Sequence, residues 1–360
     1  MTQRIGIVTG GGDCPGLNAV IRAVAKAAAN RGWESIGFHN GFEGLLEPVS
    51  FRKLDYHSLD GLLLRGGTIL GTSNRGRFAA KTGLGEVRRI PAEILDAARR
   101  TFEDLKLQAL VCIGGDGSLT IAQQLFETGI PVVGVPKTID NDLEATTITF
   151  GFDSAIAIAT DALDRLQTTA ESHQRVMVLE LMGRHAGWIA LSAGIAGGGD
   201  VILIPEIPFQ YESVCRKIVD RERRGKKFTL IVVAEGAKPK GGQVTVSDAA
   251  ASNREARYGG IGTVVAAEVE KRTGKETRVC VLGHLQRGGG PTSFDRLLCT
   301  RFGARAVELA AAGQFGMMVA LRPPDTVAVP ITEAIGRLRT VPVNGDMVRT
   351  ARALGVSLGD

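Results

Sequence analysis

The sequence is poor in three features that define other classes of protein. Aromatic residues make up only 5% of the 360 residues, and they do not alternate with basic residues as in a surface that stacks nucleic-acid bases. No apolar run approaches the roughly 20 residues of a membrane-spanning helix. The five cysteines form no C-x-x-C pair, which argues against a disulfide framework and a zinc site. We therefore expect a reduced, cytoplasmic protein that binds neither nucleic acid nor a membrane.

The net charge is also small. Forty-three Lys and Arg stand against 38 Asp and Glu, giving +5 and a pI near 9.0, and the cations are dispersed along the chain. Glycine, in contrast, reaches 47 residues, and apolar residues make up 44% of the chain at a mean hydropathy of +0.08. Abundant glycine with few aromatics is typical of α/β proteins with tight strand-to-helix turns. The length is enough for two domains.

Apolar runs alternate with segments of helical period, which predicts mainly parallel sheets covered by helices on both faces. We expect two Rossmann-like, three-layer α/β/α domains. The predicted strands are Arg4–Thr9, Trp33–Phe38, Ala109–Ile113, Val132–Val135, Arg175–Leu181, Val201–Ile204, Thr229–Ala234 and Val279–Leu282. The main predicted helices are Gly16–Asn30, Pro91–Leu105, Ser118–Glu127, Asp153–Ser172 and Ser293–Ala312.

Glycine, charge or both follow six of these strands. The segments are T-G-G-G-D-C-P-G (9–16), G-G-D-G-S (114–118), V-P-K-T-I-D-N-D-L (135–143), M-G-R-H-A-G (182–187), E-G (235–236) and G-H-L-Q-R-G-G-G-P (283–291). Ligands of open parallel sheets bind beyond the carboxyl ends of the strands. Each segment alone has a plainer interpretation: G-G-D-G also fits a tight turn or an NAD or lipid kinase, Asp140 and Asp142 could cap a helix, and His185 and His284 could be structural. Together they favour a binding site.

The residue types suit phosphoryl transfer to a phosphorylated alcohol. Glycine N–H groups and helix N-termini suit the phosphates of a donor, and Asp116 suits Mg²⁺ with water completing its shell. Asp140 can accept the proton of an attacking hydroxyl. Arginines offer cations for the transferred and anchoring phosphates; these are Arg175, Arg184, Arg278 and Arg287.

Six motifs in order, from Gly11 to about Arg305, resemble the phosphofructokinase family. They are G-G-D-C-P-G-L-N-A, G-G-D-G-S, P-K-T-I-D-N-D, S-H-Q-R, M-G-R-H-A-G and G-H-L-Q-R-G-G. The resemblance implies transfer of a phosphoryl group to the 1-hydroxyl of fructose 6-phosphate, with Mg²⁺ as cofactor and ATP as donor. We expect a donor-binding domain of residues 1–151 plus about 286–336. The sugar-phosphate domain would hold residues 152–285 plus the tail, about 337–360.

The resemblance also assigns roles to residues. Asp140 would be the base, Thr138 and Asp142 would lie beside the transferred phosphoryl group, and Arg184 would stabilise it. The donor and its metal would contact Gly12, Gly115, Asp116 (the magnesium residue), Gly117, Ser118, Lys137 and either Arg75 or Arg77. The sugar phosphate would contact Thr138, Ile139, Asp140, Met182, Gly183, Arg184, Glu235, His284, Leu285, Gln286 and Arg287. Arg175 and Arg278 resemble residues that reach into a neighbouring subunit's site, which implies a homo-oligomer, usually a tetramer.

Two positions bear on the donor. Family members that use ATP commonly have glycine where Lys137 stands, whereas pyrophosphate users have lysine there and aspartate where Gly117 stands. An aspartate would obstruct and repel the α-phosphate of a nucleotide, whereas a cation near the transferred oxygens is compatible with either donor. We therefore expect ATP, with pyrophosphate and ADP as the alternatives.

The family's effector pocket resembles Arg22, Lys26, Asp200, Arg224 and Lys226 here. Tyr56 and Gln167 stand where the family has arginines, so the resemblance does not carry over the usual nucleotide or phosphoenolpyruvate effectors.

Two other functions compete with a sugar-phosphate kinase. A dinucleotide oxidoreductase is disfavoured because the first turn lacks the G-x-G-x-x-G spacing. A non-catalytic sugar-phosphate sensor is disfavoured because it would need neither Asp116 nor Asp140. The tail V-N-G-D-M-V-R-T-A-R-A-L has no assigned function, and its plainest interpretation is packing against its own domain.

Overall fold

The computed structural model of the chain describes residues 2–73, 76–78, 88–248 and 257–360. It divides into two compact units. The first unit holds Met1–Ile139, Leu143–Ser154 and Arg287–Leu338, and the second holds Asp140–Asp142, Ala155–Gln286 and Arg339–Asp360. No helix within the described ranges is long and apolar enough to cross a membrane.

The first unit is built on a sheet of seven strands, counted over the described residues, in the order β13-β12-β5-β4-β1-β2-β3. The inner strands run parallel, and β3 and β13 pair antiparallel at the two edges. The strands are β1 (Arg4–Thr9), β2 (Glu34–Phe38), β3 (Phe51–Lys53), β4 (Leu107–Gly114), β5 (Val132–Pro136), β12 (Met317–Arg322) and β13 (Asp325–Pro330).

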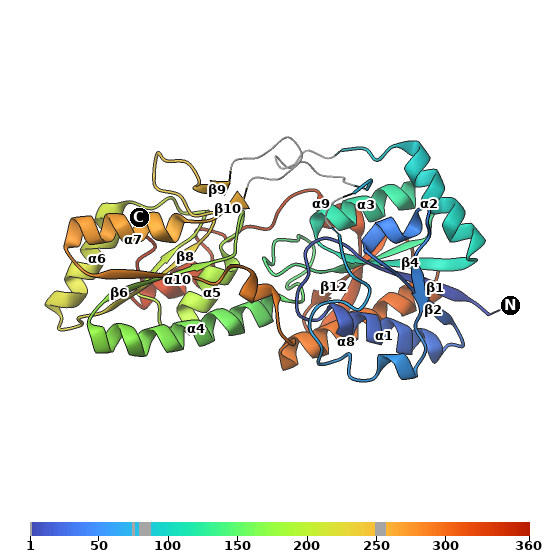
Figure 1. Cartoon of the computed structure of the whole chain (residues 1–360), viewed down its shortest axis with the longest axis horizontal. Coiled ribbons are helices and arrows are strands. Elements are labelled where there is room, and N and C mark those ends of the chain that lie inside the picture. The colour runs from blue at the N-terminus through green and yellow to red at the C-terminus, as the bar shows by residue number, and fades with distance from the viewer. Residues whose placement is uncertain (1, 74–75, 79–87, 249–256) are drawn as a thin grey trace. The chain divides into compact units, whose positions relative to one another are not determined.

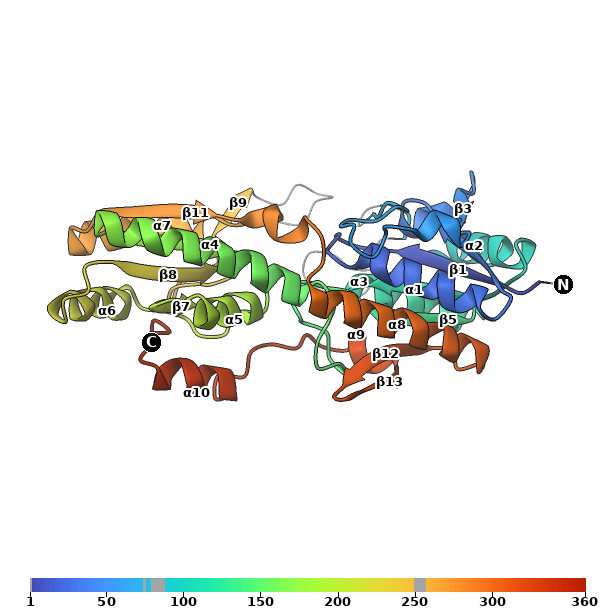
Figure 2. The same cartoon turned by 90° about the horizontal axis from the view of Figure 1, so that it is seen from below.

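Helices cover both faces of this sheet (Figures 1 and 2). On one face lie α1 (Leu17–Ala29) and α8 (Ser293–Ala311), and on the other α2 (Ala92–Asp104), α3 (Asp116–Glu127) and α9 (Ile331–Ile335), with the short helices η1 (Gly41–Leu45) and η2 (His57–Leu59) in the connections. Gly303 lets α8 approach α1 closely, since a Cβ there would lie 2.9 Å from the carbonyl oxygen of Val20. Leu110, Cys112 and Leu119 are buried on the face of α2, α3 and α9.

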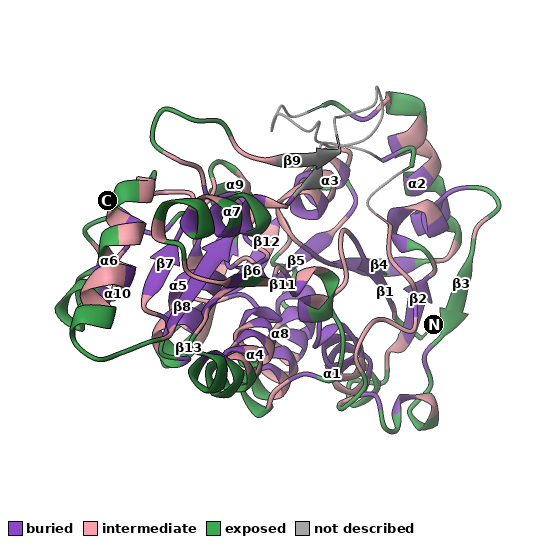
Figure 3. Ribbon diagram, turned by 60° about the vertical axis from the view of Figure 1, so that its left-hand side comes forward, coloured by how far each residue is buried: buried purple, intermediate pink, exposed green. Residues whose placement is uncertain are grey.

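The second unit has a smaller sheet with four parallel strands among the described residues, in the order β11-β6-β8-β7. The strands are β6 (Val176–Leu181), β7 (Val201–Leu203), β8 (Thr229–Ala234) and β11 (Thr277–Val281). Helices α6 (Tyr211–Arg223) and α7 (Ile261–Thr273) pack on one face. Helix α5 (Trp188–Ala196) packs on the other, together with α4 (Phe152–His173), whose first residues belong to the first unit. Figure 3 shows that β6, β7 and β8 are largely buried and that the outer sides of the helices are exposed, whereas β11 is only partly buried.

Three further elements complete the second unit. They are the antiparallel pair β9 (Val246–Asp248) and β10 (Arg257–Tyr258), helix η3 (Gly283–Arg287) at the boundary of the two units, and α10 (Asp346–Ala353) in the tail. Beyond α10, Ser357 pairs in parallel with the outer side of β7: Ile202 N donates to its carbonyl oxygen at 2.9 Å and its own N donates to Asp200 O at 3.0 Å. The tail thus packs against the second unit and covers the edge of its sheet.

A buried carboxylate lies at the start of α8. Asp295 is fully buried, and its Oδ2 accepts hydrogen bonds from the N and Oγ of Ser154 at 2.9 and 2.6 Å. Its Oδ1 has no hydrogen-bond partner among the described residues. Burial raises the pKa of this carboxyl from 3.8 to about 6, although the hydrogen bonds from Ser154 oppose the shift.

Asp295 therefore predicts a specific pH dependence of stability. Because the folded chain holds this proton more tightly than the unfolded chain, the contribution of Asp295 is full below about pH 4 and is lost as the pH rises through about 6. In Asp295→Asn the amide oxygen can still accept from Ser154 but carries no charge. The free energy of unfolding of this variant, relative to wild type, should rise by about 2–3 kcal/mol between pH 4 and pH 7 in urea titrations.

The exposed Asp161, paired with Arg165 at 2.8 Å, offers the control variant Asp161→Asn. A pH-independent difference between Asp295→Asn and wild type would contradict the raised pKa of Asp295.

Candidate functional site

Three strand ends meet at one edge of the first sheet. The register pairs Thr9 of β1 with Ile113 of β4, and Gly114 of β4 with Pro136 of β5. The turns after these strands, residues 10–13, 115–118 and 137–139, therefore leave the sheet side by side.

The turns after β1 and β4 approach so closely that only glycine fits. A Cβ on Gly10 would lie 2.6 Å from Ser118 Oγ, and a Cβ on Gly114 would lie 2.2 Å from Ser118 Cβ. Gly11 also has a φ of +78°, which favours glycine. Ser118, 6% exposed, therefore lies packed against both strand ends in the first turn of α3.

Two cations converge on the turn after β1. Lys137 is 4% exposed, and its ammonium group donates to the carbonyl oxygen of Gly12. Nη1 of Arg287 donates to the carbonyl oxygen of Asp13 at 3.1 Å, and a Cβ on Gly12 would lie 2.9 Å from the same atom. The edge thus combines positive charge with the N-terminus of a helix, which suits a phosphate group.

Asp116 and Gly117 open α3 at this edge. Asp116 is the acidic residue of the first turn, and a Cβ built on Gly117 would meet no atom within 4 Å. No group of three or more metal-binding side chains occurs among the described residues. Magnesium needs no such group, because it is usually bound by one or two carboxylates together with substrate phosphates and water. Asp116 beside a phosphate-binding edge fits that pattern.

Of the two arginines predicted to contact the donor, only Arg77 lies among the described residues. Arg77 is half exposed, its Nε lies 3.0 Å from Glu43 Oε2 and its backbone N donates to Glu43 Oε1 at 2.6 Å. Arg75 lies outside the described residues.

The loop after β5 carries the predicted reacting groups. Ile139 is fully buried, and the carbonyl oxygen of Thr138 accepts from Thr149 Oγ1 at 2.7 Å. Asp140 and Asp142 are partly buried, and Asn141 between them has a φ of +51°, so the chain turns sharply there. The carbonyl oxygen of Asp142 accepts from Arg339 N at 2.9 Å, which links this loop to the tail.

In the second unit, backbone N–H groups and one buried side chain hold together the segments after β6, β8 and β11. Met182 N donates to Oε1 of the fully buried Gln286 at 2.7 Å, and Glu235 N donates to Leu181 O at 2.8 Å. A Cβ on Gly236 would lie 2.0 Å from Arg184 O, so glycine is required for this approach. The structure therefore brings together Met182, Gly183, Arg184, Glu235 and Gln286, whereas His284 and Leu285 are exposed on η3.

Arg175 and Arg278 lie at the other end of this sheet. Arg175 precedes β6 and Arg278 is the second residue of β11, in a register that pairs Thr277 with Val176. The loop that begins at Met182 follows β6, whose six residues span about 20 Å. The two arginines are thus not brought to the predicted sugar-phosphate loops of their own chain.

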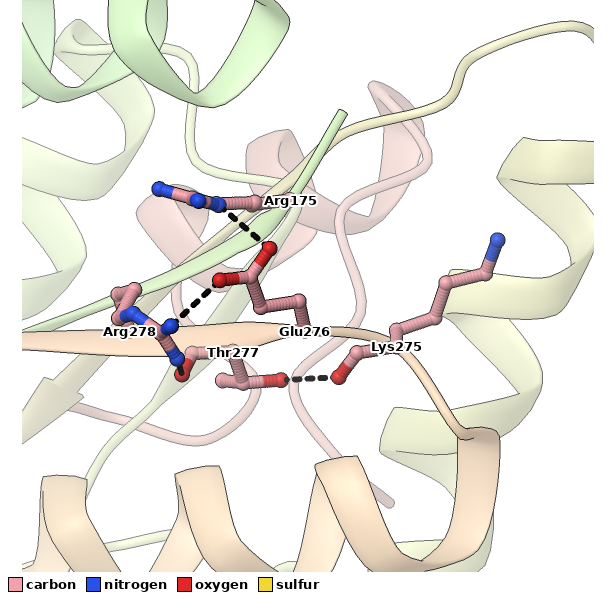
Figure 4. A network of polar contacts seen from close by, with 5 residues as sticks. All are labelled: Arg175, Lys275, Glu276, Thr277 and Arg278. Atoms are coloured by element: carbon pink, nitrogen blue, oxygen red, sulfur yellow. Dashed lines mark hydrogen bonds and ion pairs between the residues drawn. The ribbon is translucent and has the colours of Figure 1, made fainter. Parts of the chain in front are cut away.

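Glu276 joins the two arginines, as Figure 4 shows. Nε of Arg175 donates to Glu276 Oε2 at 2.7 Å, Arg278 donates to Oε1, and Arg278 Nη1 donates to Thr277 O at 3.1 Å. The hydrogen bond from Arg175 lowers the pKa of the Glu276 carboxyl. Sequence reasoning missed Glu276, although an acid two residues before a predicted anion-binding arginine was a signal.

Two of the residues that resemble the effector pocket have local partners. The Lys26 ammonium lies 4.0 Å from the ring centroid of Tyr56, which is one of the positions that depart from the family pattern. Asp200 pairs with Arg221, its Oδ2 accepts from Leu230 N at 2.9 Å, and burial raises the pKa of its carboxyl.

Fold and site together define a class: a chain of two α/β units whose glycine-rich strand ends and helix N-termini suit phosphate groups. A family model described as phosphofructokinase matches residues 4–310, and the chain belongs to this family.

Known relatives agree with this family membership. The chain is 56% identical over 360 residues to a protein of Chloroflexus aurantiacus named ATP-dependent 6-phosphofructokinase, covering 99% of this chain and 98% of that one. It is 52% identical over 344 residues to the pyrophosphate–fructose 6-phosphate 1-phosphotransferase of Amycolatopsis methanolica, covering 94% and 96%. The crystal structure of Pichia pastoris phosphofructokinase in the T-state matches with a TM-score of 0.80 and 30% identity, over 93% of this chain and only 36% of that chain.

Proposed function

We propose that the chain is an ATP-dependent 6-phosphofructokinase of glycolysis, which acts in the cytoplasm and converts fructose 6-phosphate to fructose 1,6-bisphosphate. The observation that carries this proposal is the edge where β1, β4 and β5 end, because the phosphate-binding turns there continue through Lys137 directly into the loop of Asp140 and Asp142. The relative at 56% identity with an ATP-dependent name supports it.

The first unit binds the donor in this proposal. The N–H groups of the turn after β1 and of the first turn of α3 hold the phosphates, with Ser118 beside them. Lys137 and Arg287 add positive charge at the same turn. Asp116 would hold Mg²⁺, which when bound neutralises charge on the phosphate oxygens.

The acceptor chemistry belongs to Asp140 and its neighbours. O1 of the sugar forms a bond to the γ-phosphorus, the bond from that phosphorus to the bridging oxygen of ADP breaks, and Asp140 takes the hydroxyl proton. Thr138 and Asp142 position the reacting groups, and Arg184 stabilises the charge on the transferred group. The second unit supplies the sugar-phosphate contacts. These are Met182, Gly183, Arg184, Glu235, His284, Leu285 and Gln286, together with Arg287 of the first unit.

Asp140→Asn tests the base directly. The amide is nearly isosteric but cannot accept the proton, so kcat should fall by about 10²–10⁴ while the fold is kept. A coupled assay of fructose 1,6-bisphosphate formation measures the rate, and circular dichroism with thermal unfolding checks the fold. Near-normal kcat in a folded variant would show that Asp140 is not the base.

ATP is the proposed donor because of the open space at Gly117. With no atom within 4 Å of a Cβ position, the backbone at the start of α3 leaves room for an α-phosphate. Lys137 is compatible with either donor, since its ammonium group contacts the carbonyl oxygen of Gly12 at the turn proposed to hold donor phosphates. A relative named for pyrophosphate at 52% identity keeps pyrophosphate as the alternative, with ADP as a second.

Gly117→Asp should separate these donors. The new carboxylate enters open space, so the fold should tolerate it, but it repels the α-phosphate and should lower kcat/KM for ATP by about 10²-fold or more. Lys137→Gly should lower activity without changing the preferred donor. Assays with ATP, ADP and pyrophosphate on wild type and both variants measure this. If the wild-type chain used pyrophosphate but not ATP, the open space at Gly117 would not indicate the donor, and the ATP assignment would be wrong.

The proposed assembly is a homo-oligomer, a tetramer, in which Arg175 and Arg278 bind the sugar phosphate of a neighbouring subunit. Their location at the amino ends of β6 and β11, away from the loop that follows β6, supports a site shared between chains. Their bridge through Glu276 keeps both guanidinium groups close to each other.

Arg278→Ala tests the shared site. Removing a charge-assisted hydrogen bond to a phosphate costs about 1.5–3 kcal/mol, so KM for fructose 6-phosphate should rise far more than KM for ATP. Mixing this variant with Asp140→Asn should restore part of the activity, because some hybrid sites then hold both wild-type residues. No recovery after verified subunit exchange would place each site within one chain.

A further inference from the structure

The segment that joins the first unit to the tail contacts the Asp140–Asp142 loop and the start of α5. Arg339 N donates to Asp142 O at 2.9 Å, and Trp188 Nε1 donates to Arg339 O at 3.0 Å. The Arg339 guanidinium carbon lies 4.7 Å from the centroid of the Trp188 ring, close enough for a cation–π interaction. Residues Arg339–Val341 are called the clasp below.

Glu206 ties the clasp to the loop that follows β6. Its Oε1 accepts from Val341 N at 2.7 Å and from Gly187 N at 3.0 Å, and its Oε2 lies 3.1 Å from Gly187 N. Burial raises the pKa of this carboxyl, and the backbone hydrogen bonds oppose the shift. A Cβ on Gly187 would lie 2.4 Å from Ile204 Cβ and 2.9 Å from Glu206 Oε2, so the end of the loop is packed tightly against this carboxylate.

The far end of the tail is anchored independently of the clasp. Ser357 pairs with the edge of β7, Leu358 is 1% exposed, and Gln210 N donates to Gly359 O at 2.6 Å. Lys217 Nζ donates to Gly355 O at 2.6 Å. A segment fixed at this end can hold the loops at the other, because its free movement is already restricted.

We propose that the clasp is a positioning device: it holds the Asp140–Asp142 loop and the Met182–Gly187 loop in one fixed geometry, and so sets the affinity for the sugar phosphate and the rate of transfer. Both loops lack regular secondary structure, and a misplacement of about 1 Å at a reacting group is enough to lower a rate strongly. The proposal rests on the proposed function, because it assigns the two loops to that reaction.

Two mild substitutions open the clasp at different points. Trp188→Phe removes the donor to Arg339 O but keeps an aromatic ring beneath the guanidinium group. Glu206→Gln keeps one acceptor oxygen and removes the charge that both N–H groups share. The chain contains two tryptophans, and Trp33, in the first unit before β2, gives the matched control Trp33→Phe.

Both clasp variants should raise KM for fructose 6-phosphate roughly fivefold or more, or lower kcat by a similar factor, since each loses about one hydrogen bond from a loop-positioning contact. KM for ATP should change less than about twofold, because the clasp holds loops of the second unit whereas the donor is proposed to bind the turns of the first. Trp33→Phe should match wild type. Unchanged kinetics for the sugar phosphate in both variants, or equal rises of KM for both substrates, would overturn the proposal.

Amide hydrogen exchange separates this idea from the proposed function. In the wild-type chain without substrate, the N–H groups of Gly187 and Val341 should be protected, and Glu206→Gln should lower that protection by roughly tenfold. Full protection in the variant would show that Glu206 does not hold the loop. A wild-type chain that fails to phosphorylate fructose 6-phosphate would instead defeat the proposed function, while the exchange result would still report on the clasp.

Discussion

The candidate site depends first on parallel strand pairing. Parallel strands about 4.8 Å apart place their carboxyl ends at one edge, and the registers of β1, β4 and β5 bring three turns together there. The turns can approach only because Gly10 and Gly114 carry no side chain where Ser118 packs. The positions of the helix N-terminus and Lys137 follow from this approach, since each comes within a few residues of a paired strand end, and the chain continues from Lys137 into the loop of Asp140 and Asp142. A larger residue at position 10 would push the turn after β1 away from α3, and one at position 114 would push the end of β4 away from Ser118 in the first turn of α3.

Sequence reasoning succeeded where the pattern is local. The expected α/β architecture with mainly parallel sheets and the phosphofructokinase family are both confirmed, and β1 and β8 begin and end as predicted. Strand β11 was predicted to begin at Val279 but begins at Thr277. Strand β11 lies at the edge of the sheet, so it can expose Arg278. The sequence prediction placed the start of the strand after this charged residue, because the run of apolar residues begins there. The hairpin of β12 and β13 was missed. Its two strands pair locally, whereas its place beside β5 depends on the distant residues Val133 and Gly134.

The site itself was predictable only as a set of residues. Glycine, aspartate and lysine after strands can be read from the chain, and the roles assigned to them stay predictions. The contacts that position these residues are harder to predict from the sequence. The links from Arg339 to Asp142 and from Val341 and Gly187 to Glu206 use backbone N–H groups, which every residue except proline possesses, so they leave no signature in the sequence. Glu276 differs, because a side-chain ion pair between neighbouring strands was open to inference from E-T-R.

The two edge strands of the second sheet differ: the tail covers β7, whereas β11 exposes several side chains. This difference bears on the proposed assembly. The edge of β7 is covered by the chain's own tail, where Ser357 accepts and donates the hydrogen bonds of an added strand. The opposite edge strand, β11, exposes Arg278 and Val281, and Leu285 beyond it is 67% exposed. Among the described residues, no strand pairs with the outer side of β11, and an edge strand that exposes apolar side chains suits a contact with another chain. The same strand carries the arginine proposed to act in a neighbouring site, so a partner that covers this edge would bury the apolar residues and receive the arginine in one contact. The tail occupies the β7 edge, so in the proposed homo-oligomer a second copy of the chain would meet this sheet at β11, the opposite edge strand among the described residues.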